Sequence, residues 1–141
     1  MAVAESCTGG KLGDMITSVP GSSDYFLGGI ISYSNSAKVG LLGVDPEALR
    51  TLGAVSEEVA VQMADGVRAA FGADIGMSTT GIAGPGGGSA EKPVGLVYIA
   101  ASTKDGTSCR RLMSAGARDE IKTRSSESAL AFALELLARS E

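Results

Sequence analysis

Residues 1–10 read MAVAESCTGG, and this stretch decides the class of fold that we expect. Its apolar beginning, Met1 to Ala4, is typical of a short buried strand that ends near Glu5. Ser6 to Gly10 follows with small, polar and flexible residues, which favour a tight turn into a helix that runs to about Thr17. Because a strand that turns directly into a helix is typical of α/β domains, we expect an α/β protein.

The same alternation of strands and helices continues along the rest of the chain. Expected strands span residues 26–33, 75–80, 94–102 and 108–114. Expected helices begin after Ser34 or Asn35, after Asp45, after Ser56 and at about Arg118. An Asp-Gly pair at residues 105–106 indicates a hairpin between the last two strands. We predict one domain over residues 1–141, a three-layer α/β/α sandwich around a mixed, mostly parallel sheet.

The sequence contains no histidine, and this absence restricts the chemistry more than any other feature of the composition. It excludes Ser-His-Asp triads, Cys-His pairs and zinc sites built on histidine. Because the chain also has only two cysteines, we expect no zinc site. We also expect no other metal and no cofactor. An enzyme with this composition has to use a lysine, a carboxylate or a tyrosine as its base.

Charge and hydropathy point to a small-molecule partner. The formal net charge is -4, so we expect no broad basic surface for nucleic acid. No apolar run reaches the roughly 18 to 20 residues that cross a bilayer, and the first residues lack a charged leader, so we expect a cytoplasmic protein without membrane contact. Cys7 and Cys109 lie far apart and do not suggest a secreted disulfide framework, so we expect free thiols.

Three polar segments flanked by glycine lie next to the ends of predicted strands or helices: Ser6 to Gly10, Gly21 to Ser23, and Thr79 to Gly88. Ligands of α/β sheets collect at such places. Ser6 to Gly10 also precedes a helix, whose free N–H groups favour a phosphate or an oxyanion. Any one of these segments can equally be a tight connection without a ligand, and only their combination favours a site.

Tyr33 and Lys38 fall at the end of a strand and in the first turns of a short helix. A lysine withdrawn from water loses proton affinity and can act as a base toward a serine hydroxyl. The alternative is an ordinary solvated lysine. Four residues separate Tyr33 from Lys38 instead of three, and no Gly-x-Gly-x-x-Gly precedes the first helix, so a short-chain dehydrogenase is not indicated.

Arg118 and Cys7 are further candidates. Near the start of the last helix, the guanidinium of Arg118 can clamp a phosphate or carboxylate, or it can be a solvated helix charge. Cys7 lies inside the first glycine-flanked segment, but the chain has no histidine to activate it, and a small buried thiol is the commoner state.

Six ordered motifs together carry a resemblance to a known family. They are Ala4 to Gly10, Pro20 to Phe26, Gly28 to Lys38, Gly53 to Ser56, Thr80 to Gly87, and Lys92 to Gly95. In this order and spacing they resemble the C-terminal domain of the competence/damage-inducible protein family, CinA, over essentially the whole chain. The resemblance implies an α/β fold, usually oligomeric, that converts nicotinamide mononucleotide and water to nicotinate mononucleotide and ammonia.

The resemblance also assigns roles to residues of this chain. It implies functional positions at Ser6, Ser23, Tyr33, Lys38, Thr80 and Arg118. Together with the glycine-rich turns, this gives Ser23, Ser6, Lys38 and Tyr33 as candidate catalytic residues. Candidate substrate-binding residues are Thr8, Gly9, Thr80, Gly81, Gly84 and Arg118.

The expected mechanism is a serine amidase without metal. Lys38, oriented by Tyr33, takes the proton of a serine that attacks the carboxamide; Ser23 is slightly preferred over Ser6, and the sequence leaves both open. A non-catalytic nucleotide-binding module and a purely structural oligomerisation domain are the alternatives. Two departures from the family bear on this: its domain begins with an extra helix and a longer first strand, and it has an aspartate where this chain has Ala117.

Overall fold

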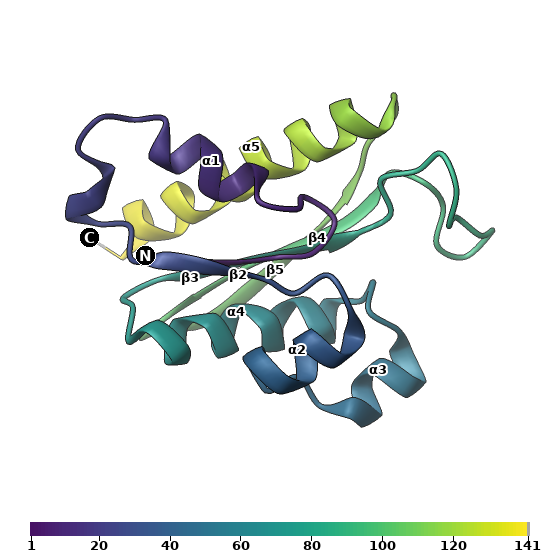
Figure 1. Cartoon of the computed structure of the whole chain (residues 1–141), viewed down its shortest axis with the longest axis horizontal. Helices are drawn as coiled ribbons and strands as arrows, with labels where there is room; N and C mark the ends of the chain where they lie inside the picture. Colours follow the sequence, from purple (N-terminus) through teal and green to yellow (C-terminus); the bar gives the residue numbers. More distant parts are fainter. Residues whose placement is uncertain (141) are drawn as a thin grey trace.

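The computed structural model describes residues 1–140, which contain one five-stranded sheet with helices beside it (Figure 1). The strands are β1 (Ala2–Glu5), β2 (Gly28–Ile31), β3 (Gly76–Gly81), β4 (Leu96–Thr103) and β5 (Gly106–Met113). They lie in the order β2-β1-β3-β4-β5. β1 pairs in parallel with β2 on one side and with β3 on the other, which brings the ends of three strands together at one edge.

The sheet is mixed, as expected, but the prediction of a mostly parallel sheet is wrong. β4 runs antiparallel to both β3 and β5, so two neighbouring pairs are parallel and two are antiparallel. A parallel return usually requires a crossover helix. Residues 82–95, between β3 and β4, contain no helix, and the chain returns directly along β3. The glycines of this segment form a loop at the edge of the sheet instead.

Helices lie on both sides of the sheet in Figure 1, and the α/β class is confirmed. α1 (Lys11–Thr17) and α5 (Arg118–Arg139) are on one side. α2 (Asn35–Leu42), α3 (Pro46–Leu52) and α4 (Glu57–Phe71) are on the other, and the 3₁₀ turn η1 (Ser22–Asp24) lies between α1 and β2.

The core follows the alternation of side chains along β1. Val3 belongs to a buried cluster that includes Leu12 of α1 and Phe132 of α5. Its neighbour Ala2 belongs to a second cluster that includes Met63 of α4. Successive residues of a strand point to opposite faces of the sheet, so a short run of four buried residues anchors helices on both sides.

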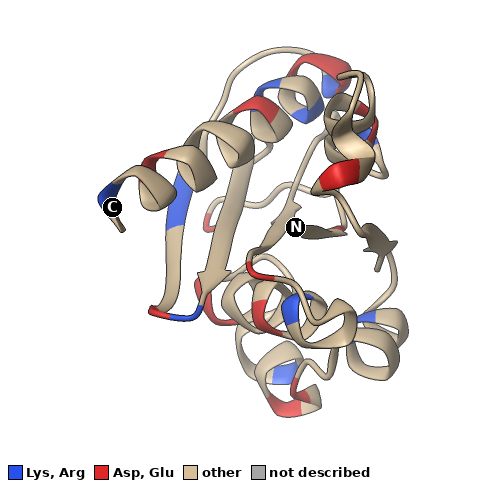
Figure 2. Ribbon diagram, turned by 90° about the vertical axis from the view of Figure 1, so that its left-hand side faces the viewer, with Lys and Arg blue, Asp and Glu red and all other residues tan. Residues whose placement is uncertain are grey.

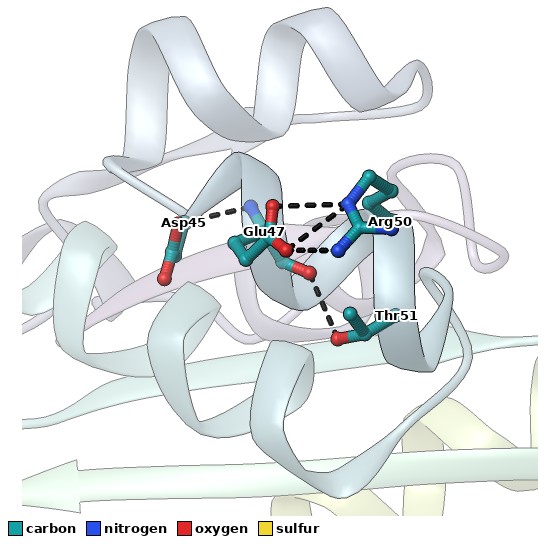
Figure 3. Close-up of polar contacts among 4 residues, drawn as sticks. All are labelled: Asp45, Glu47, Arg50 and Thr51. Atoms are coloured by element: carbon teal, nitrogen blue, oxygen red, sulfur yellow. Dashed lines mark hydrogen bonds and ion pairs between the residues drawn. The ribbon is translucent and has the colours of Figure 1, made fainter.

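The expected caps fix where the helices begin. Ser34 caps α2 by accepting a hydrogen bond from the N–H of Ala37 at 3.1 Å, and Ser56 caps α4 in the same way. At the start of α3, Asp45 accepts from the N–H of Glu47 at 2.9 Å, and Glu47 pairs with Arg50 one turn later (Figure 3). The N-cap of α2 matters most for function, because this helix carries Lys38.

α4 packs closely on β3. A Cβ at Gly76 would overlap the carbonyl oxygen of Ala64 and the side chain of Arg68, so only glycine fits there. Val59, Met63 and Val67 are buried as the periodicity predicts, but Ala70, which was expected on the same face, is exposed near the end of the helix. α4 and the start of β3 are therefore in close contact.

Charged residues are interspersed along the helices and loops (Figure 2). Within residues 1–140 two charged side chains are buried: Glu5 is 2% exposed and Lys38 is 1% exposed. No helix in this part of the chain combines the length and the hydrophobicity that crossing a bilayer requires. Burial of a charged group costs free energy unless the group is paired or hydrogen-bonded. The contacts that Glu5 and Lys38 make therefore determine what their burial costs.

Candidate active site at the carboxyl ends of three strands

A pocket of about 260 Å³ opens where β1, β2 and β3 end. Ser6 follows β1, Tyr33 and Lys38 follow β2, and Thr80 is the second-to-last residue of β3. Ligands of α/β sheets bind beyond the carboxyl ends of the strands, and the pocket lies there. Its lining consists of Ser6, Cys7, Tyr33, Asn35, Lys38, Ala54, Val55, Thr80, Gly81, Ile82, Ala83, Gly84, Gly86, Gly87 and Arg118.

Lys38 is held against a serine hydroxyl. Its Nζ lies 3.0 Å from Oγ of Ser6, and it donates to the carbonyl oxygens of Ser32 at 2.7 Å and Tyr33 at 3.3 Å. No carboxylate forms a salt bridge with it anywhere in residues 1–140. The lysine is therefore buried among neutral groups, and the alternative of an ordinary solvated lysine does not apply.

The surroundings of Lys38 favour its neutral form. Burial of the side chain lowers the pKa of Lys38 below the usual lysine value, although attraction to the Cys7 sulfur opposes the shift. A neutral amine has two N–H groups and one lone pair. When the two N–H groups bind the carbonyl oxygens of Ser32 and Tyr33, the lone pair faces the hydroxyl of Ser6. The amine is thereby oriented to accept the serine proton.

The backbone holds Ser6 in place on both sides. Its N–H donates to the carbonyl of Thr79 on β3 at 3.0 Å, and its own carbonyl accepts from the N–H of Gly9 at 3.1 Å. Gly9 and Gly10 have φ angles of 59° and 108°, in the left-handed region that favours glycine. The glycine pair thus lets the chain reverse immediately after the serine and enter α1.

The N-terminus of α1 holds a side chain of the protein rather than a ligand. The carboxylate of Glu5 accepts hydrogen bonds from the N–H groups of Gly10, Leu12 and Gly13. These three N–H groups are therefore occupied by an internal carboxylate, and a phosphate or oxyanion bound at Ser6 to Gly10 would have to use other N–H groups of that segment. Thr8 is buried against Glu5 and Thr79, and neither Thr8 nor Gly9 lines the pocket.

Ser23 lies away from the pocket within one chain. It is exposed in η1, which precedes β2, whereas Ser6 follows β1. β1 and β2 run parallel with Ala2 opposite Gly28, so the start of β2 and the end of β1 lie at opposite ends of the strands. The two segments lie at different ends of the sheet in Figure 1. Ser6 rather than Ser23 is the serine beside Lys38.

Arg118 joins the two rims of the pocket. Its Nη1 donates to the carbonyl oxygen of Gly84 at 2.7 Å, and its Nη2 lies 3.3 Å from the hydroxyl of Tyr33. Tyr33 thus orients Lys38 through its carbonyl, while its exposed ring reaches the arginine. Thr80 is buried and donates to the carbonyl of Ala54, and Gly81 lies beside it in the lining.

Lys38 and Arg118 are the charged residues of the pocket lining, and both are basic. No carboxylate appears among the lining residues of the described chain. With a buried amine and an exposed guanidinium in its lining, the pocket suits a substrate that combines a neutral reacting group with an anion.

For several lining residues the sequence predicted no role in the site. Asn35, Ala54, Val55 and Ile82 belong to motifs that carry the family resemblance, and none of them was assigned a role in the site. Their motif positions were the available signal. The contribution of Ser32 could not be inferred, because it acts through its backbone carbonyl, which every residue has.

Cys7 lines the same pocket with a buried thiol. It is a free cysteine, 9% exposed, and burial raises the pKa of Cys7 to about 12. Burial likewise raises the pKa of the half-buried Cys109, to about 11. We therefore expect neither thiol of the native protein to react appreciably with iodoacetamide at about pH 8, because the thiolate is the reacting form. Mass spectrometry after timed labelling measures this.

Unfolding the chain in guanidinium is the control for this prediction, and both thiols are then expected to be labelled within minutes. Fast labelling of Cys7 in the native protein would contradict the expected neutral thiol and reopen its role as a nucleophile.

The arrangement can be compared with known proteins. The model of the CinA C-terminal domain family matches residues 1–137. The chain belongs to the CinA C-terminal domain family. A relative from Moorella thermoacetica is 60% identical over 130 residues, which are 92% of this chain and 31% of the relative. A CinA-like protein of Chlorobaculum tepidum is 56% identical over 135 residues, which are 92% of this chain and 32% of that protein. The chain thus spans about a third of the length of these curated relatives.

Solved structures of CinA relatives share the fold. The competence/damage inducible protein CihA of Agrobacterium tumefaciens is 42% identical, with a TM-score of 0.93 over 99% of this chain and 84% of that one. The competence damage-inducible protein A of Klebsiella pneumoniae is 34% identical, with a TM-score of 0.95 over 99% of this chain and 87% of that one. The family resemblance drawn from the six motifs is confirmed.

Proposed function

We propose that this CinA domain hydrolyses the carboxamide of nicotinamide mononucleotide to nicotinate mononucleotide and ammonia. The observation that carries the proposal is the contact of 3.0 Å between Nζ of Lys38 and Oγ of Ser6 inside the pocket. The chain has no histidine, and this pair supplies a nucleophile and a base without one. The proposal follows the activity that the family resemblance implies.

In the first half of the reaction Lys38 takes the hydroxyl proton of Ser6. The Ser6 oxygen attacks the carboxamide carbon and forms a tetrahedral intermediate. The N–H of Cys7 is the proposed donor to the resulting oxyanion, because Cys7 follows Ser6 in the lining and its N–H donates to no other residue within residues 1–140. Such a donor lowers the barrier by roughly 3 kcal/mol in other hydrolases.

In the second half the C–N bond breaks. The Lys38 ammonium returns its proton to the departing nitrogen, which leaves as ammonia, and Ser6 remains as an ester of nicotinate mononucleotide. Water attacks this ester while Lys38 accepts the water proton. The Ser6 oxygen takes a proton from Lys38 as nicotinate mononucleotide leaves, and the site returns to its starting state.

The basic lining supports a mononucleotide over an uncharged amide. In this proposal Arg118 binds the phosphate with charge-assisted hydrogen bonds, having exchanged its contacts with Gly84 and Tyr33 for the substrate. The purified chain is expected to release ammonia and nicotinate mononucleotide in equal amounts, at a rate that a chelator does not change. A ligand-dependent rise in melting temperature without any ammonia would overturn the catalytic proposal in favour of a binding module.

Replacement of Arg118 tests the phosphate contact. In Arg118→Ala we expect the KM for nicotinamide mononucleotide to rise about 10- to 100-fold with little change in kcat, because a contact made equally in ground and transition states is lost. Steady-state ammonia release measures both constants.

Arg111→Ala is the matched control, since Arg111 is an exposed arginine of β5 outside the pocket lining. Nicotinamide riboside, which lacks the phosphate, should show no difference between wild type and Arg118→Ala. An equal loss with both substrates would contradict the assignment of Arg118 to the phosphate.

A further inference from the structure

Glu5 is a buried carboxylate without an ion pair among residues 1–140, and the proposed reaction does not use it. It accepts four hydrogen bonds instead. Oε1 accepts from the hydroxyl of Thr8 at 2.6 Å and from the N–H groups of Leu12 at 2.8 Å and Gly10 at 3.2 Å. Oε2 accepts from the N–H of Gly13 at 3.0 Å. A buried carboxylate is tolerated when its oxygens are satisfied in this way.

These hydrogen bonds fix the turn that begins at Ser6. The turn is closed by the bond from the N–H of Gly9 to the carbonyl of Ser6, and Glu5 ties the following N–H groups back toward β1. Without the carboxylate, two glycines with left-handed φ angles would leave this turn many conformations. The direction of the Ser6 side chain therefore depends on the Glu5 carboxylate.

The backbone of Glu5 supports the base from the other side. Its carbonyl accepts from the N–H of Ser32 at 2.8 Å, and the carbonyl of Ser32 accepts from Nζ of Lys38 at 2.7 Å. One residue thus connects the turn of the nucleophile with the carbonyl that orients the amine.

The hydrogen bonds that link the hydroxyl groups of Thr79 and Thr8 to Glu5 can run in only one direction. A carboxylate oxygen accepts, so Thr8 donates to Glu5, and Thr79 must then donate to Thr8, at 2.7 Å. These hydrogen bonds tie the turn to β3, the strand that also accepts from the N–H of Ser6. Both oxygens of Glu5 accept hydrogen bonds. A glutamine at position 5 would replace one of these oxygens by an NH₂ group, which would then face a donor instead of accepting from it.

We propose that Glu5 is a positioning residue, whose carboxylate holds the turn so that the hydroxyl of Ser6 meets the amine of Lys38. The inference rests on the proposed function and adds a residue to the same site. Glu5 itself does not line the pocket and does not touch the substrate.

Glu5→Gln tests the inference by a split between kcat and KM. We expect kcat for nicotinamide mononucleotide to fall about 50-fold while KM stays within about threefold, because misaligned reacting groups affect the chemical step and not the binding of the phosphate. The acidic limb of the pH profile should keep its midpoint, since Lys38 remains buried. Thr8→Val, which removes one of the four bonds and keeps the shape of the side chain, should lower kcat about fivefold.

Ser78→Ala is the matched control for lost stability. Ser78 is fully buried on β3, donates to the carbonyl of Ala60 at 2.6 Å and does not belong to the pocket lining. Its loss should lower the melting temperature while kcat stays at the wild-type value. If Glu5→Gln folds and keeps the wild-type kcat, or if only its KM changes, the positioning role is overturned.

A second measurement separates this inference from the proposed function. If the wild-type chain releases no ammonia, the proposed function fails, and a crystal structure of Glu5→Gln or Thr8→Val then decides the positioning role. A separation of Ser6 Oγ and Lys38 Nζ beyond hydrogen-bond distance in the variant supports it. An unchanged separation near the wild-type 3.0 Å overturns it.

Discussion

Lys38→Met is expected to lower kcat/KM for nicotinamide mononucleotide about 1,000-fold, within the range that loss of a general base produces. Methionine has a similar length and no basic nitrogen, so the hydroxyl of Ser6 loses the acceptor that now lies 3.0 Å away. Ammonia release at saturating and at limiting substrate measures the change. Lys104→Met, an exposed lysine of the hairpin outside the pocket, should retain wild-type activity.

The pH dependence gives an independent check on Lys38. Only the neutral amine accepts a proton, so kcat/KM of the wild type should rise with pH up to the pKa of Lys38. Burial lowers this pKa, and the rise should therefore finish below the range of an ordinary lysine. Near wild-type activity in Lys38→Met would show that Lys38 is not the base.

Stability should respond to pH in the same direction. The pKa of Lys38 is lower in the folded chain than in the unfolded chain, so the unfolded chain binds more protons between the two values. The contribution of Lys38 to the free energy of unfolding thus increases as pH rises through this interval. In urea unfolding, the free energy of unfolding of the wild type minus that of Lys38→Met should therefore rise with pH below the ordinary lysine pKa, and the titration of Cys7 and Cys109, present in both proteins, cancels in this difference.

Ser6→Ala is expected to abolish ammonia release, with a loss of at least about 10,000-fold, because the attacking oxygen itself is removed. Ser23→Ala should stay within about twofold of the wild type. Ser23 is exposed in η1 and lies outside the pocket lining, whereas Ser6 contacts Lys38. Both variants are measured in the ammonia assay that serves for Lys38→Met.

Binding of the substrate distinguishes lost chemistry from lost structure in this pair. Ser6→Ala should still show the rise in melting temperature that nicotinamide mononucleotide causes in the wild type, since Arg118 and the loop after β3 are intact. An active Ser6→Ala together with an inactive Ser23→Ala would reverse the assignment of the nucleophile.

The local structure was predictable from neighbouring residues. Ser34, Asp45 and Ser56 mark helix starts because their side chains accept hydrogen bonds from N–H groups two or three residues later. The apolar run after Lys92 and the Asp-Gly pair predicted the β4–β5 hairpin for equally local reasons. The prediction of a mostly parallel sheet was wrong. The direction of β4 depends on the path that residues 82–95 take in space, and neighbouring residues do not determine this path.

The candidate site, too, could be predicted from the sequence only in part. The sequence by itself determined which chemistry is available: no histidine, a lysine and two serines near glycine-rich turns, and an arginine at the start of the last helix. Only the tertiary structure decided that Lys38 meets Ser6 and not Ser23, and that Glu5 occupies the end of α1. The physical reason is that parallel pairing of β1 with β2 and β3 brings residues 6, 38 and 80 together at the carboxyl ends of these strands. The spacing of these residues along the chain does not predict their contact.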